Sequence, residues 1–170
     1  MRTEDTSQRY REDPEKSREL RMQTARDLPE DGATFLDIVT FEQRRAERYR
    51  HYLVVAVLTP RKVGIGDLVR IASRSVRASD LVGAVSPDGS FRWDCNRSGR
   101  DPRDHEPEQA RAFMSGSLGL VFPETDRTGA EAAIARIVEK VGVDGAVSVR
   151  CAVYPDDSTD PRRLVAITAA

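Results

Sequence analysis

One stretch of this sequence, Leu53-Val54-Val55-Ala56-Val57-Leu58, is an unbroken apolar run. It limits the possible folds more than any other feature. A strand with one face in water alternates apolar and polar residues, whereas a strand buried on both faces is apolar throughout. Thr59-Pro60 follows the run and ends it. We therefore predict a central strand that is covered on both faces.

The flanking sequence supplies the elements that cover such a strand. Thr34 can cap a helix that carries apolar residues at helical spacing as far as Tyr49, with residues 42–45 on its solvated face. Gly64 and Gly66 indicate a loop, and apolar positions from Leu68 to Val76 then predict a second helix. Further strands are expected at 81–85, 118–122 and 146–154, and further helices at 129–141 and 162–169. Two strands that follow one another around the Pro87-Asp88-Gly89 turn imply antiparallel pairing, so we expect an α+β fold with a mostly antiparallel central sheet flanked by helices.

Two segments lie outside this pattern. Residues 1–32 are charged and poor in large apolar side chains, which favours a leader that is disordered or partly helical, with a helix possible over 14–26. Residues 33–170 form the predicted domain, which carries an insertion at about 90–117. Five arginines and five acids balance in that insertion, and its few large apolar residues predict a small contribution to the core.

Charge and cysteine content exclude several classes of protein. The formal net charge of -1 gives no general attraction to nucleic acid or to an anionic membrane surface. No apolar run approaches the length of a membrane span. Cys95 and Cys151 form neither a disulfide framework nor a metal-binding spacing, which favours a reducing cytoplasmic setting and predicts no cofactor.

Several motifs, taken in order, resemble the GGDEF family of diguanylate cyclases. They are Glu42-x-x-Arg45-Ala46-x-Arg48-Tyr49 before the apolar strand, Arg77-x-x-Asp80-Leu81-Val82, Leu120-Val121-Phe122-Pro123-Glu124-Thr125-Asp126 with the following helix, and Ala152-Val153-Tyr154-Pro155-Asp156-Asp157. The resemblance covers residues 35–168. It implies the family's cyclase-like fold and a role in signalling in a bacterial cytoplasm.

The departures from the family pattern concern its chemistry. Attack of a ribose hydroxyl on an α-phosphate needs divalent metal held by carboxylates. The resemblance places Thr59 and Arg61 where those acids should stand, and Ser86-Pro87 where a glycine pair should approach the nucleotide. We therefore expect a degenerate domain that is not an enzyme, with no catalytic residues and no metal.

What the resemblance implies to be retained is the family's inhibitory site for cyclic di-GMP. Arg77 and Asp80 match its Arg-x-x-Asp motif, and Arg136 matches a second arginine on the later helix. Arginine can bind a guanine edge or a phosphate with two parallel donors, and aspartate can accept from guanine. Two other interpretations stay open. Arg77 and Asp80 can simply pair with each other while Arg136 is solvated, and the domain can be a protein–protein interaction scaffold with no nucleotide ligand.

Overall fold

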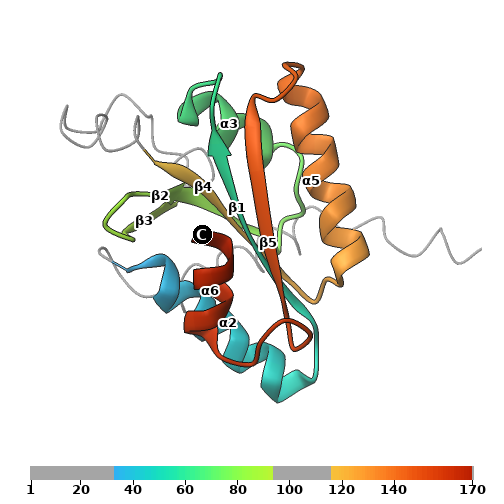
Figure 1. The fold of residues 1–170 in the computed structure, drawn as a ribbon. Helices are drawn as coiled ribbons and strands as arrows, with labels where there is room; N and C mark the ends of the chain where they lie inside the picture. The colour runs from blue at the N-terminus through green and yellow to red at the C-terminus, as the bar shows by residue number, and fades with distance from the viewer. Residues whose placement is uncertain (1–32, 94–115, 170) are drawn as a thin grey trace, which may run out of the picture.

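The computed structural model describes residues 33–93 and 116–169 of the chain. They build a five-stranded sheet in the order β3-β2-β4-β1-β5, in which all pairings between neighbouring strands are antiparallel (Figure 1). The strands are β1 (Leu53–Pro60), β2 (Leu81–Val85), β3 (Phe91–Trp93), β4 (Ser117–Pro123) and β5 (Val147–Tyr154). The helices described are α2 (Phe35–Tyr49), α3 (Ile65–Ser73), α5 (Arg127–Val141) and α6 (Pro161–Ala169).

The helices cover both faces of this sheet. In Figure 1, α2 and α6 lie on one face, and α3 and α5 lie on the other. Side chains of β1 enter both layers, since Val54, Ala56 and Leu58 pack with α3 and α5 while Leu53 and Val55 pack with α2 and α6. The prediction of a central strand buried on both faces is confirmed, and so is the α+β fold class.

Helix α2 begins at a capping box. The Thr34 hydroxyl accepts from the backbone N–H of Asp37, and the Asp37 carboxylate accepts from the backbone N–H of Thr34 at 2.8 Å. The Thr34 hydroxyl also donates to the Asp37 carboxylate at 2.7 Å, and this bond, together with the one from the Thr34 N–H, holds the pKa of the Asp37 carboxyl below its usual range. The predicted cap is confirmed, but the predicted solvated face is wrong in part, because Glu42 and Gln43 are buried. Glu42 is accommodated by an ion pair with Arg45, and the Gln43 amide donates to the carbonyl of Thr159.

Helix α3 begins earlier than the sequence predicts. Gly64 is its extended N-cap, and the Leu68 N–H donates to the Gly64 carbonyl, so Gly66 lies inside the helix rather than in a loop. The helix also ends at Ser73, before the predicted Val76. The hydroxyls of Ser73 and Ser75 donate to backbone carbonyls four residues earlier, which gives these side chains local partners as the helix ends.

The β2–β3 hairpin extends the sheet into the predicted insertion. Phe91 of β3 is buried and stacks on Phe35 of α2 at a ring separation of 5.5 Å. The predicted leader (1–32) with its helix over 14–26, and residues 94–115 of the predicted insertion, lie outside the described residues. The domain bounds therefore remain a prediction, except that residues 91–93 form a strand rather than a loop because Phe91 has an apolar partner. Within the described residues, no helix is both long enough and apolar enough to cross a bilayer.

Candidate functional site

Strands β1 and β2 end, and β4 begins, at the same end of the sheet, where the tip of the β2–β3 hairpin also lies. We call this the hairpin end of the sheet. Val85 of β2 is in register with Ser117 of β4, and the Ser117 hydroxyl lies 3.1 Å from the Thr59 hydroxyl. The sheet therefore brings Thr59 and Ser86-Pro87 to the same end, as the resemblance implies for a cyclase site. The groups that meet there are neutral hydroxyls.

The tip of the hairpin is fixed by its own hydrogen bonds. The N–H of Gly89 donates to the carbonyl of Ser86 at 2.9 Å, and Gly89 has a φ of 83°, a conformation that favours glycine. The Asp88 carboxylate accepts from the N–H and the hydroxyl of Ser90. Asp88, the acid nearest to the tip, thus serves the turn itself.

The tip is also bonded to the start of α2. The Phe35 N–H donates to the carbonyl of Gly89 at 2.9 Å, and the Phe91 N–H donates to the carbonyl of Ala33 at 3.0 Å. Backbone groups at the hairpin tip are therefore engaged by the protein. In a nucleotide-binding loop, the backbone N–H groups would instead face phosphate.

A divalent metal does not fit this donor set. Thr59 offers a neutral hydroxyl that is already paired with Ser117, and Arg61 would place a like charge near the ion. The Arg61 N–H donates to the carbonyl of Ala146, which anchors the residue beside the loop before β5. Among residues 33–93 and 116–169, no group of three or more His, Cys, Asp or Glu side chains is arranged to hold a metal ion.

Arg77 and Asp80 form a turn just before β2. One Asp80 carboxylate oxygen accepts from the Arg77 backbone N–H at 2.7 Å, and the Asp80 N–H donates to the Arg77 carbonyl at 3.2 Å. Asp80 is 3% exposed, whereas Arg77 is exposed. The structure brings these two predicted residues together and gives the aspartate a structural role, since it fixes the backbone from which Arg77 projects.

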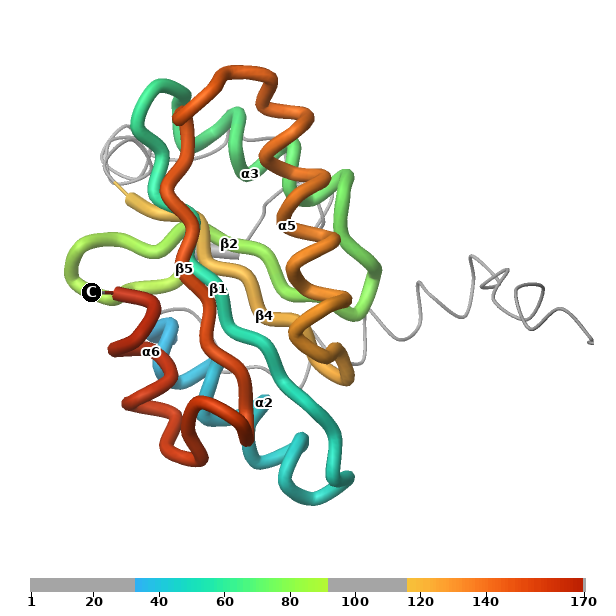
Figure 2. The backbone as a smooth tube through the Cα atoms, turned by 45° about the vertical axis from the view of Figure 1, so that its right-hand side comes forward, coloured from blue at the N-terminus to red at the C-terminus, as the bar shows by residue number. Residues whose placement is uncertain are grey.

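Arg136 lies on the flank of α5 that faces this turn. Figure 2 shows the chain between α3 and β2 running alongside α5. The Lys140 ammonium donates to the Ser75 hydroxyl at 3.1 Å, and Arg136 is one helical turn before Lys140 on the same side of the helix. Arg77, Arg136 and Lys140 are all exposed, and we call these three residues the basic face.

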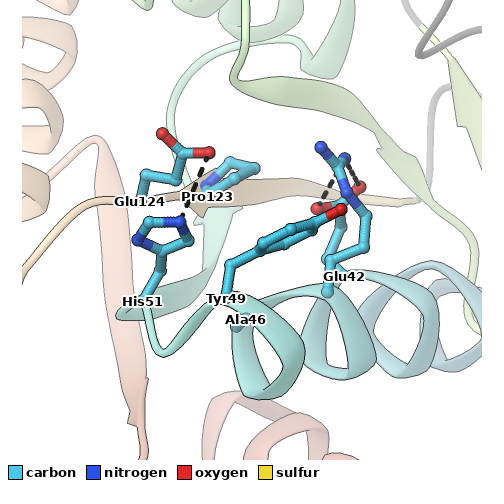
Figure 3. A pocket seen from close by; sticks show the side chains of 7 residues that line it. Glu42, Ala46, Tyr49, His51, Pro123 and Glu124 are labelled. Carbon is cyan, nitrogen blue, oxygen red and sulfur yellow. Dashed lines mark hydrogen bonds and ion pairs between the residues drawn. The ribbon is translucent and has the colours of Figure 1, made fainter.

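A small pocket that the sequence analysis did not predict lies at the C-terminal end of α2 (Figure 3). Glu42 is 2% exposed and accepts from the Arg45 guanidinium at 2.9 Å and 3.1 Å. Burial raises the pKa of the Glu42 carboxyl, although Arg45 opposes the change. Across the pocket, His51 lies 4.0 Å from Glu124, which follows β4 in a left-handed conformation with a φ of 56°.

The sequence offers one indirect hint of this pocket. Glu42, Arg45 and Tyr49 are spaced at three and four residues, which places them on one helix face. The other side of the pocket is formed by Pro123 and Glu124, which are more than seventy positions later in the sequence. Such long-range packing leaves no mark on local spacing.

Comparisons with known proteins place the chain by its fold. No family model matches the sequence, and no curated protein matches it. Among solved structures, a DGC protein from Thermotoga maritima is similar, with a TM-score of 0.50 and 16% sequence identity over 79% of this chain and 88% of that chain. At this identity the likeness shows the fold alone, and it supports the GGDEF-like architecture.

Proposed function

We propose that this chain is a non-catalytic, GGDEF-like signalling domain that binds cyclic di-GMP at its basic face. The observation that carries the proposal is the arrangement of Arg77 and Arg136. Arg77 projects from a turn that Asp80 holds in place, and two residues before that turn the Ser75 hydroxyl accepts from Lys140 of α5, one helical turn after Arg136. The assignment of Arg77, Asp80 and Arg136 to a ligand site rests on this arrangement together with the motif resemblance.

The chemistry of the basic face suits a dinucleotide. Each guanidinium can donate two parallel hydrogen bonds to a phosphate or to the O6 and N7 of guanine. The three cations of the face attract a ligand that carries two phosphates. Because one Asp80 oxygen is engaged by the Arg77 backbone, we assign the principal contacts to the two arginines.

The lack of cyclase activity is proposed from the residues at the hairpin end. Thr59 replaces a metal-binding acid, and Ser86-Pro87 replaces backbone that should approach the nucleotide closely. The hydrogen bonds from Phe35 and Phe91 further engage the tip. We expect purified protein with GTP and magnesium to form no cyclic dinucleotide, and turnover that survives replacement of both Thr59 and Ser86 by alanine would refute this placement of the site.

The binding site is tested by a matched set of arginine variants. Arg77→Ala and Arg136→Ala should each weaken cyclic di-GMP binding by about tenfold to a hundredfold, because each removes a charged partner worth about 1–3 kcal/mol. Arg70→Ala is the control, since it also removes one exposed arginine, but from α3 and outside the basic face. Equal weakening in all three variants would show a nonspecific charge effect instead of a site.

A protein–protein interaction scaffold without a nucleotide ligand is the second candidate. One observation favours it, namely the exposed aromatic residues at the end of α2. Tyr49 is 59% exposed and Tyr52 is 47% exposed, with His51 between them and its ring 6.0 Å from that of Tyr49. Tyrosine is enriched at protein interfaces. If the domain is such a scaffold, Tyr49→Ala should abolish binding of an identified partner while Arg77→Ala leaves that binding unchanged.

A further inference from the structure

Strand β5 is the long edge of the sheet, and its outer side carries no neighbouring strand among the described residues (Figures 1 and 2). An exposed edge presents unpaired N–H and C=O groups to any strand of matching length. The pairing of β5 with β1 is regular over its whole length, from Tyr154 opposite Leu53 to Val147 opposite Pro60. A bulge, which would twist the edge away from a partner, is absent from this pairing.

The hydrogen bonds of Val153 show which backbone groups face outward. Its N–H donates to the Asp157 carboxylate at 2.8 Å, and its carbonyl accepts from the Asp157 N–H at 2.7 Å, so neither group bonds to β1. In an antiparallel ladder the outward-facing residues alternate. The residues whose backbone groups face outward are therefore Val147, Val149 and Cys151, as well as Val153.

Both ends of this edge are limited by the protein itself. At one end Asp157 occupies the outward groups of Val153, and at the other the extended backbone begins only after Gly145, whose φ of 63° is left-handed. The open part is thus limited to residues 147–151. It is symmetric about Val149, which is 39% exposed.

We propose that this edge pairs with the same edge of a second copy of the chain. The pairing is antiparallel and two-fold about Val149, so that Val147 of each copy lies opposite Cys151 of the other. It is the register in which every open N–H and C=O of both edges finds a partner, because a shift by two residues would meet the groups that Asp157 already engages. This surface lies on the other flank of α5 from the basic face, and the proposal goes beyond the proposed function.

Charges at the two ends of the edge are complementary in this arrangement. The Cys151 end is net acidic, because Glu131 and Asp157 outnumber Arg127 there. The Val147 end is net basic, because Arg61 and Lys62 outnumber Asp144 there. Antiparallel pairing brings the acidic end of one copy to the basic end of the other. At the centre, Arg150 lies opposite Ser148 of the second copy, but the two Arg150 side chains are diagonal neighbours and repel. The resulting dimer should be weak and dependent on concentration.

Sedimentation velocity on the full chain, over a series from low to high micromolar protein, tests the proposal. Wild-type protein should shift from monomer to dimer across the series. Val149→Lys places like charges directly opposite at the two-fold axis, so this variant should remain monomeric. Val149→Thr keeps a β-branched side chain at the same position and should dimerise like wild type. Wild-type protein that is monomeric throughout, or a dimer that persists in Val149→Lys, would overturn the proposal.

A crosslink tests the register independently of the lysine variant. Opposed residues in a hydrogen-bonded antiparallel pair have Cα atoms about 5.5 Å apart, which lies within the range that a disulfide spans, about 4.4–6.8 Å. In a Cys95→Ser background, Val147→Cys should give a covalent dimer on mild oxidation, through Cys151 of the other copy. Adding Cys151→Ser should prevent it. A Val147→Cys protein that gives no covalent dimer, or a dimer that survives Cys151→Ser, would contradict this register.

Discussion

At the scale of single residues, Asp80 shows how one buried side chain can hold the backbone from which Arg77, a residue of the proposed binding site, projects. Its carboxylate accepts from the Arg77 backbone and is almost fully buried. Asp80→Ala should lower the free energy of unfolding by about 1–3 kcal/mol, because it leaves a buried donor without its acceptor. Asp80→Asn retains an acceptor oxygen and should stay close to wild-type stability in urea unfolding. Equal stability of all three proteins would show that the hydrogen bond does not hold the turn.

Glu42 gives a second prediction at this scale, in the pH dependence of stability. Because burial raises its pKa above the usual 4.5, the folded protein binds more protons than the unfolded chain between pH 4.5 and the raised value. The contribution of Glu42 to stability is therefore greatest below this window and falls as pH rises through it. Urea unfolding of Glu42→Gln should show a smaller decline across the window than wild type. Glu47→Gln, an exposed change on the same helix, should decline as wild type does, and an unaltered decline in Glu42→Gln would contradict the assignment.

At the scale of elements, Gly119 of β4 allows α2 and the β2–β3 hairpin to pack on the sheet. A Cβ at this position would lie 2.7 Å from a Val85 methyl carbon, 2.8 Å from the Phe35 ring and 3.0 Å from the Phe91 ring. Gly119→Ala should therefore cost about 1–3 kcal/mol of stability through overpacking. Gly66→Ala is the control, since a Cβ added there would meet nothing within 4 Å, and in helix α3 the change should be neutral or stabilising by about 0.4–1 kcal/mol. Similar denaturation midpoints for wild type and Gly119→Ala would show that these elements pack less tightly than these distances imply.

Elements with strong local patterns are predictable from sequence, and elements that depend on distant partners are not. Three features can be recognised from short stretches of sequence, namely the apolar run of β1, the Thr34 cap and the apolar stripe of α5. Strand β3 escapes prediction because Phe91 is held by Phe35 and by the backbone of Ala33, more than fifty positions earlier. The local pattern assigns Glu42 to solvent for the same reason, since the pocket that Glu42 lines is completed by Pro123 and Glu124, which are distant in the sequence.

At the scale of the whole molecule, the hairpin end and the basic face lie in different parts of the structure. The hairpin end gathers Thr59 and Ser117 beside a tip that is bonded to α2. The turn of Arg77 lies at the start of β2, beside α5, whereas the hairpin tip follows the end of β2. The motif spacing in the sequence predicts which residues belong to each surface. It cannot predict that Asp80 is buried beneath the Arg77 turn, because that burial follows from tertiary packing.

The central claim, that this domain binds cyclic di-GMP without acting as a cyclase, is tested most directly by calorimetric titration of the dinucleotide into wild-type protein. The account predicts a saturable heat change with one class of site, and a much smaller response to GTP, which lacks the second guanine and the cyclic phosphates. The basic face would supply that affinity through Arg77 and Arg136. Folded protein that gives no heat with cyclic di-GMP at high micromolar concentration would contradict the claim and would leave the interaction scaffold as the better account.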